Sequence, residues 1–251
     1  MSDAAVAADA ANPASPASNP YGFGALIDHG TSVSYLILGI LLLLSLVSWY
    51  ITFTKLWDQY RLGKAARNVE KNFWAAASAR EGADRLPRDD DFRVIAESAI
   101  RAAAHYESRL ADRITMREWL SMALDRSVDS LNSKLASGLS FLATVGSTAP
   151  FIGLIGTVYG ILTALLQIGV SGQPSIDKVA GPVGEALIMT ALGLFVAVPA
   201  VFAYNVLLKR NKAIQDIMRE FTGDLEANLI GGVKPELAPR RPAAAAPAAK
   251  K

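Results

Sequence analysis

The chain has 251 residues, of which 51% are hydrophobic, a formal net charge of +2 and no cysteine. The missing thiols exclude disulfides and thiolate chemistry, and long uncharged runs indicate a membrane protein rather than a soluble domain. His29 and His105 have no acidic or histidine neighbour at ligand spacing, so no metal site is expected. We expect no cofactor, no nucleic-acid partner and no enzymatic activity, since the chain has neither a glycine-rich phosphate loop nor a serine elbow.

The first two predicted segments are a tail and a membrane helix. Residues 1–30 open on alanine, proline, serine and asparagine, which predicts a short disordered tail and no signal peptide. Residues 31–54 contain an apolar run of 22 residues, Val33 to Thr54, which is long enough for a first transmembrane helix. Aromatic residues toward both ends are typical of anchoring at the two membrane interfaces: Tyr35, Trp49, Tyr50 and Trp57.

Basic residues predict the orientation of the chain. Residues 1–54 contain no lysine or arginine, whereas a group of basic residues follows directly: Lys55, Arg61, Lys64, Arg67 and Lys71. A second group follows the last apolar segment: Lys209, Arg210, Lys212 and Arg219. Because cytoplasmic loops carry the excess of basic residues, we expect the N-terminus outside, and the C-terminus and residues 55–137 in the cytoplasm.

Residues 55–137 are predicted to be a cytoplasmic helical segment. Asp89 to Asp91, after Pro87, predict a helix start, because acids are favourable at the positive end of the helix dipole. Two apolar stripes at helical spacing follow: Ile95, Ala99, Ala102, Tyr106 and Leu110, then Met116, Leu120, Leu124, Val128, Leu131 and Leu135. They predict amphipathic helices that pack on each other or on a neighbouring subunit. The second stripe predicts one continuous helix into the next membrane segment.

Residues 138–168 and 181–208 are predicted to be the second and third transmembrane helices, joined by a loop over 169–180 that lies outside. One face of each carries small residues, among them Gly153, Gly156, Gly160, Gly193 and Ala197. In lipid, small residues let helix backbones approach closely, so we expect these faces to pack together. Proline residues inside or near the starts of these segments predict kinks: Pro150, Pro182 and Pro199.

Beyond the third apolar segment, residues 209–232 are predicted to continue as a cytoplasmic helix. Ile214, Ile217, Phe221 and Leu225 recur at helical spacing, and Gly231 and Gly232 predict its end. Residues 233–251 are rich in proline and alanine, which predicts a disordered tail.

Glu185 is the one charged residue within 181–208. An ionisable group in a membrane helix costs about 2.5 to 3.5 kcal/mol on insertion scales, so it predicts a functional site. With Thr157 and Thr190 it is expected to line a polar path. Two alternatives stay open: each hydroxyl bonds only the carbonyl four residues earlier in its own helix, or Glu185 is an interfacial carboxylate that reaches solvent beside Lys178.

Two sequence blocks carry a family resemblance. ATVGSTAPFIGLIGTVYGI (Ala143–Ile161) and GPVGEALIMTALGLFVAVPAVFAYN (Gly181–Asn205) resemble the proton-channel family of ExbB, TolQ and, more distantly, MotA. The resemblance implies an all-α membrane protein with three transmembrane helices and long cytoplasmic helical extensions. It also implies a place in the inner membrane of a bacterium, with the N-terminus and the loop over 169–180 in the periplasm. It implies a ring-shaped homopentamer around a dimer of a single-span partner, ExbD or TolR, with Thr157 and Thr190 lining the pore and Glu185 as its intramembrane glutamate. The Gly181-Pro182 order departs from the Pro-Gly frequent in the family and shifts the expected helix start.

The resemblance also implies what the proton flow drives. In ExbB systems a TonB-like protein opens outer-membrane receptors for iron chelates and cobalamin, whereas TolQ systems act on TolA and envelope constriction. The N-terminal extension, the SIDKVAGPVGEAL loop and the short basic tail resemble ExbB more closely. A scaffold that only stabilises its single-span partner stays an alternative. A solute carrier or an enzyme is disfavoured, because an inverted repeat, a nucleophile and metal ligands are missing.

Overall fold

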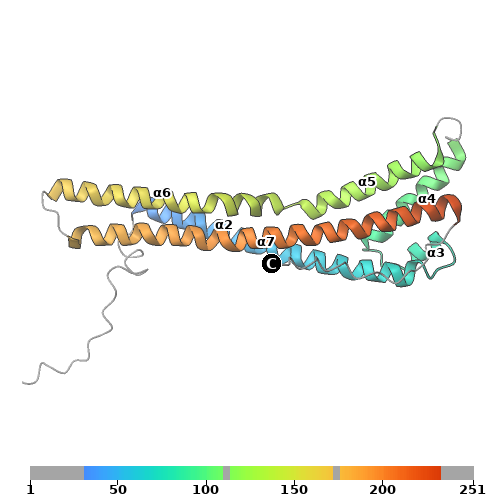
Figure 1. Cartoon of the computed structure of the whole chain (residues 1–251), viewed down its shortest axis with the longest axis horizontal. Helices are drawn as coiled ribbons and strands as arrows, with labels where there is room; N and C mark the ends of the chain where they lie inside the picture. Colours follow the sequence, from blue (N-terminus) through green and yellow to red (C-terminus); the bar gives the residue numbers. More distant parts are fainter. Residues whose placement is uncertain (1–30, 110–113, 172–175, 233–251) are drawn as a thin grey trace, which may run out of the picture. The chain divides into compact units, whose positions relative to one another are not determined.

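The computed structural model describes residues 31–109, 114–171 and 176–232, and within these ranges every regular element is a helix (Figure 1). The elements are α2 (Ser32–Asn68), the π-helical turn η1 (Val69–Phe73), α3 (Ala79–Asp84), α4 (Asp91–Arg109), α5 (Met116–Ala136), α6 (Leu139–Ser171) and α7 (Ile176–Gly231). The all-α fold class is therefore confirmed for the described residues. The predicted tails and residues 172–175 of the predicted loop lie outside them.

Three helical stretches are long and apolar enough to cross a membrane: Ser32–Phe73, Met116–Val170 and Val179–Gly231. In the most apolar window of each, 17%, 17% and 39% of the residues are buried, so α7 is the most enclosed of the three. α7 begins at Ile176, ahead of the expected start at 181, and Pro182 therefore lies inside the helix. Side chains that remain exposed on α6 and α7 are large and apolar, as a lipid-facing surface requires: Phe151, Ile155, Val158, Leu165, Phe195 and Phe202.

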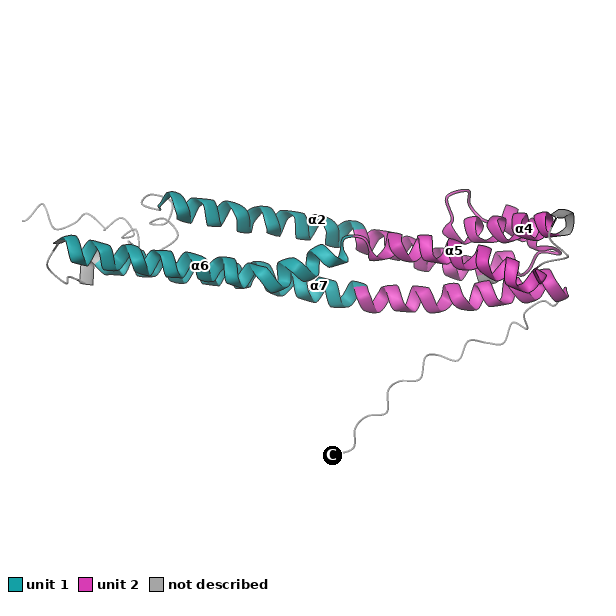
Figure 2. Cartoon of the chain, turned by 90° about the horizontal axis from the view of Figure 1, so that it is seen from above, with its two compact units in different colours: residues 1–54, 138–207 teal, residues 55–137, 208–251 magenta. Residues whose placement is uncertain are grey.

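The chain divides into two compact units (Figure 2). Unit 1 comprises Met1–Thr54 and Gly138–Leu207, and unit 2 comprises Lys55–Ser137 and Leu208–Lys251. The core of unit 1 is built from α2, α6 and α7 and consists mainly of small and β-branched residues: Ile37, Leu41, Val145, Ala149, Met189, Val196, Ala197 and Ala200. Such side chains leave the helix backbones close together.

The core of unit 2 is larger and contains aromatic rings. The Phe221 ring of α7 meets those of Phe73 and Phe92 at centroid distances of 5.2 and 5.4 Å. The two predicted apolar stripes supply much of the remaining core, with Ile95, Ala99, Ala102, Leu120, Leu124, Leu131 and Leu135 all buried. The amphipathic character of α4 and α5 is therefore confirmed, because their apolar faces pack against one another and against α7.

One expectation about the helices is wrong. The helix through residues 116–168 is not continuous, since α5 ends at Ala136 and α6 begins at Leu139. Gly138 has φ +83°, a left-handed conformation that glycine adopts without a steric penalty. Ser137 is also outside the helical region, with φ −58° and ψ 133°. A single glycine therefore ends α5, as glycine commonly does just past a helix end.

Helix ends elsewhere follow the sequence signals. α4 begins at Asp91, and the Asp90 carboxylate caps it by accepting a hydrogen bond of 2.9 Å from the Phe92 amide. α5 begins with a capping box formed by Thr115 and Glu118. α7 ends at Gly231, and Gly232 follows with φ +64°. The predicted start near Asp89 to Asp91 and the predicted end at Gly231 and Gly232 are both confirmed.

Candidate functional site

Glycines bring α6 and α7 into backbone contact within unit 1. A Cβ atom on Gly193 would lie 2.7 Å from the Ala149 carbonyl oxygen, and one on Gly153 would lie 2.6 Å from the Met189 carbonyl oxygen. Real Cβ atoms do not approach other atoms so closely, so neither position has room for a side chain. Gly156 and Gly160 lie against Met189 and Ala186 in the same manner, and Ala197 is buried in the same core. The contact between α6 and α7 therefore depends on these small residues.

The same contacts fix the level of each candidate residue along the two helices. The pairs run antiparallel: Gly160 against Ala186, Gly156 against Met189, Gly153 against Thr190 and Gly193, and Gly146 against Val201. Glu185 is therefore level with the Gly160 turn, and Thr190 is level with the Gly153 turn. Thr157 lies between these turns on α6. With a rise of about 1.5 Å per residue, five residues separate Glu185 from Thr190 by about 7.5 Å along the axis.

The hydroxyl of Thr157 already has one partner. Its Oγ1 donates a hydrogen bond of 2.7 Å to the Leu154 carbonyl of its own helix. This is the local bond that the first alternative expects, although it reaches back three residues rather than four. The hydroxyl oxygen still has lone pairs that can accept a second hydrogen bond. Among the described residues, no side-chain hydrogen bond is made by Thr190, and none joins Thr157, Glu185 and Thr190 to one another.

Glu185 is half-buried, and one of its carboxyl oxygens is enclosed. The Oε1 atom has almost no accessible surface and has no hydrogen-bond partner within the described part of the chain. Its neighbour Ala186 packs on Gly160, so the α6–α7 contact holds this turn of α7 in place. The side chain of Lys178, the partner considered in the second alternative, lies outside the described residues. An oxygen in this position is able to accept a hydrogen bond or a proton.

Unit 2 contains a second buried polar site, which the sequence pattern did not lead us to expect. Gln59 and Asn211 are 2% and 4% exposed, and the Gln59 amide donates to the Asn211 Oδ1 at 2.6 Å. The Asn211 amide donates in turn to the Leu135 carbonyl at 3.0 Å. The sequence does carry a signal for this site, because Asn211 interrupts an apolar stripe at helical spacing. The stripe consists of Leu207, Ile214, Met218 and Phe221. A buried amide on an apolar face requires a polar partner.

Comparisons with known proteins identify the family of this chain. Residues 91–220 match the model of the MotA/TolQ/ExbB proton channel family. Biopolymer transport protein ExbB of Xanthomonas campestris pv. campestris is 43% identical over 236 residues, which cover 88% of this chain and 93% of the relative. The protein of the same name from Neisseria meningitidis is 35% identical over 82% of this chain and 96% of the relative. Tol-Pal system protein TolQ of Haemophilus influenzae is 33% identical over 79% of this chain and 91% of the relative.

Proposed function

This chain belongs to the MotA/TolQ/ExbB proton channel family, and we propose that within it the chain is an ExbB-like subunit of an inner-membrane motor driven by the proton-motive force. The motor energises transport across the outer membrane through a TonB-like protein, with iron-siderophore complexes and cobalamin as cargo. The chain assembles as a homopentamer around a dimer of an ExbD-like single-span protein. Its N-terminus is periplasmic, its C-terminus is cytoplasmic, and unit 2 lies in the cytoplasm.

The observation that carries this proposal is the enclosed Oε1 of Glu185, which has no partner within the described residues. Leaving a buried acceptor unsatisfied costs about 1 to 3 kcal/mol, so a proton or a donor from another chain is needed there. Glu185 is the one acid in the third apolar segment, and one acid per subunit is too little for a complete proton relay. A second chain that contributes a titratable group supplies what is missing, and Thr157 and Thr190 add hydroxyls to the same path.

Energetics require several protons in each cycle. One elementary charge that crosses a potential of 100 mV releases about 2.3 kcal/mol. Mechanical work on a partner protein therefore has to draw on repeated proton transfers. A ring of identical subunits, each with its own Glu185, provides repeated sites around one axis. This repetition supports a ring-shaped assembly over a single conducting chain.

The choice of an ExbB-like role over a TolQ-like role rests on the relatives. Identity to the proteins named ExbB is 43% and 35%, against 33% for the TolQ of Haemophilus influenzae. The alternative is a TolQ-like subunit of a Tol-Pal envelope system. A non-conducting scaffold that stabilises a single-span partner is the second alternative, because small-residue helix faces also serve assembly alone.

A complementation experiment separates these functions. In a strain that lacks its own copy of the gene, Glu185→Ala and Thr190→Val are expected to abolish growth on a scarce siderophore while the protein remains in the membrane. Asp216→Asn removes an exposed acid from the same helix and is the matched control. A scaffold tolerates all three substitutions as long as assembly survives. If the chain is a TolQ-like subunit, the wild-type gene is expected to restore detergent resistance to a strain that lacks TolQ, and not growth on the siderophore.

A further inference from the structure

Unit 2 contains a cavity that the proposed function does not use. Its volume is about 370 Å³. It lies between the part of α2 that belongs to unit 2, the loop before α4 and the end of α5. Leu62, Leu131 and Leu135 form apolar parts of its wall. The charged residues that line it are Lys55, Asp58, Arg61 and Lys64 from α2, Asp89 and Asp90 from the loop before α4, Asp91 from α4, and Lys134 from α5.

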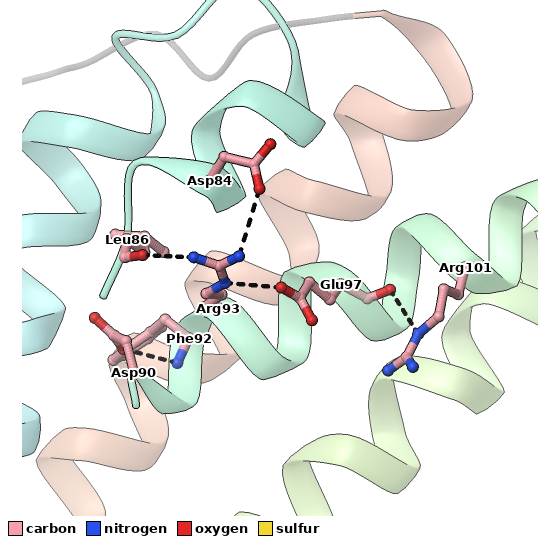
Figure 3. A network of polar contacts seen from close by, with 7 residues as sticks. All are labelled: Asp84, Leu86, Asp90, Phe92, Arg93, Glu97 and Arg101. Carbon is pink, nitrogen blue, oxygen red and sulfur yellow. Dashed lines mark hydrogen bonds and ion pairs between the residues drawn. The ribbon is translucent and has the colours of Figure 1, made fainter. Parts of the chain in front are cut away.

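Asp90 is the buried acid of this cavity. It is 6% exposed, and its Oδ1 accepts the Phe92 amide at 2.9 Å (Figure 3). Removal from water raises the pKa of Asp90, and the charge of Asp91 raises it further. The hydrogen bond from Phe92 and the charge of Arg61 lower it, but burial is the larger effect and the pKa stays above its ordinary value. The folded chain therefore holds the Asp90 proton more tightly than the unfolded chain.

Three of the four cations around the cavity are paired with other groups, and among the described residues Lys64 has no such partner. Arg61 lies 3.4 Å from Asp89, and Lys134 lies 3.3 Å from Asp91. Lys55 donates to the Lys134 carbonyl at 2.9 Å and to the Ser137 hydroxyl at 2.7 Å. Among the described residues, no ion pair includes Asp90 itself. Ionisation of Asp90 therefore requires water, the side chain of Lys64, or a cation that is taken from a neighbouring acid.

Arg93 holds one end of the loop over residues 85–90, which precedes α4. Figure 3 shows the Arg93 guanidinium between the Leu86 carbonyl, which it meets at 2.9 Å, and the carboxylates of Glu97 and Asp84, at 2.7 and 3.4 Å. A guanidinium stays charged at every physiological pH. The loop over residues 85–90 is therefore held at one end by a group that does not titrate and at the other end by Asp90, which does.

We propose that Asp90 is a pH-responsive latch of unit 2. When Asp90 is protonated, its side chain remains buried beside the cavity. Residues 87–90 then stay packed against the cavity wall. When Asp90 is ionised, water or a cation of the cavity enters to solvate the carboxylate, the cation being Lys64, Arg61 or Lys134. The loop then opens at its Asp90 end while Arg93 keeps Leu86 in place. The inference does not rest on the proposed proton channel, because all of these groups belong to unit 2.

Hydrogen exchange of the full chain in detergent micelles tests the latch. Peptides that cover residues 85–92 are compared by mass spectrometry between about pH 4.5 and pH 7.5, after correction for the intrinsic exchange rate. For the wild type, we expect corrected exchange to be faster at the upper pH, because a group whose pKa is raised by folding stabilises the closed state less as the pH rises through that pKa. Asp90→Asn keeps an acceptor for the Phe92 amide but does not ionise, so its corrected exchange is expected to be independent of pH.

Asp129→Asn is the matched control, because it removes the charge of an exposed acid of α5 that does not line the cavity. This variant is expected to follow the wild type at every pH. Asp90→Ser provides a second capping residue that does not ionise, in case Asp90→Asn folds poorly. Identical curves for the wild type and Asp90→Asn would overturn the proposal and leave Asp90 as a helix cap only. Loss of the pH dependence in Asp129→Asn would overturn it as well.

Discussion

Gly153 of α6 and Gly193 of α7 face each other without a side chain between them. A Cβ atom built on Gly193 would lie only 3.2 Å from the Gly153 Cα. Two helix backbones that touch in this manner leave little freedom to slide, because any larger residue collides with the opposite main chain. This contact fixes the position of Thr190 along the helix axis, next to the Gly153 turn of α6, which is one turn before Thr157. The geometry of the candidate proton path therefore begins with two glycines.

Gly193→Ala should destabilise unit 1. The added methyl group would lie 2.7 Å from the Ala149 carbonyl oxygen, and such overpacking costs about 1 to 3 kcal/mol. The midpoint of thermal denaturation in detergent is expected to fall. Gly169→Ala adds the same methyl group to α6 where nothing lies within 4 Å, and it should leave the midpoint unchanged or raise it slightly. Equal midpoints for both variants would contradict the close contact.

Asn211→Leu should destabilise unit 2. The substitution leaves the Gln59 amide and the Leu135 carbonyl without the hydrogen bonds of 2.6 and 3.0 Å that Asn211 provides. Loss of a partner at a buried polar group costs about 1 to 3 kcal/mol. Asn72→Leu changes an exposed asparagine and is expected to have little effect on urea denaturation. A similar loss in both variants would show that the buried network does not contribute.

Glu118 should make stability depend on pH in the acid range. Hydrogen bonds from the Thr115 amide and hydroxyl lower the pKa of Glu118 below its ordinary value. A lowered pKa contributes stability above the ordinary pKa of glutamate, and that contribution is lost as the pH falls through the folded-state pKa. Glu118→Gln keeps the capping box without a titrating group, so its denaturation midpoint should fall less than that of the wild type on acidification. Parallel curves would contradict this assignment.

Periodicity predicted the helices, but it did not predict where one of them breaks. Apolar residues such as Leu120 and Leu124 recur at helical spacing, and local spacing is sufficient to define a helix and its buried face. Gly138 ends α5 with help from distant residues. Lys55 donates to the Lys134 carbonyl at 2.9 Å, and Asn211 donates to the Leu135 carbonyl at 3.0 Å, so two other helices satisfy the carbonyl groups at this end. Such contacts are not visible in a local sequence pattern.

The sequence also predicted only part of the candidate site. Glu185 stands out in the sequence because a charge in an apolar segment is rare, and the glycine faces stand out because small residues repeat. The enclosed Oε1 of Glu185 and the buried carboxyl of Asp90 do not stand out, since burial depends on which atoms of other segments cover a side chain. Asp90 belongs to a run of three acids that reads as an exposed helix start, and only the fold distinguishes it from Asp89.

Proton flux through the reconstituted assembly is the most direct test of the role of Glu185. The chain and its single-span partner are incorporated into liposomes that contain a pH-sensitive dye, and a membrane potential is imposed. Glu185→Gln, which keeps the size of the side chain but does not ionise, is expected to reduce proton entry to the rate of empty liposomes, whereas Asp216→Asn retains the rate of the wild type. Proton entry at the wild-type rate in Glu185→Gln would contradict the account.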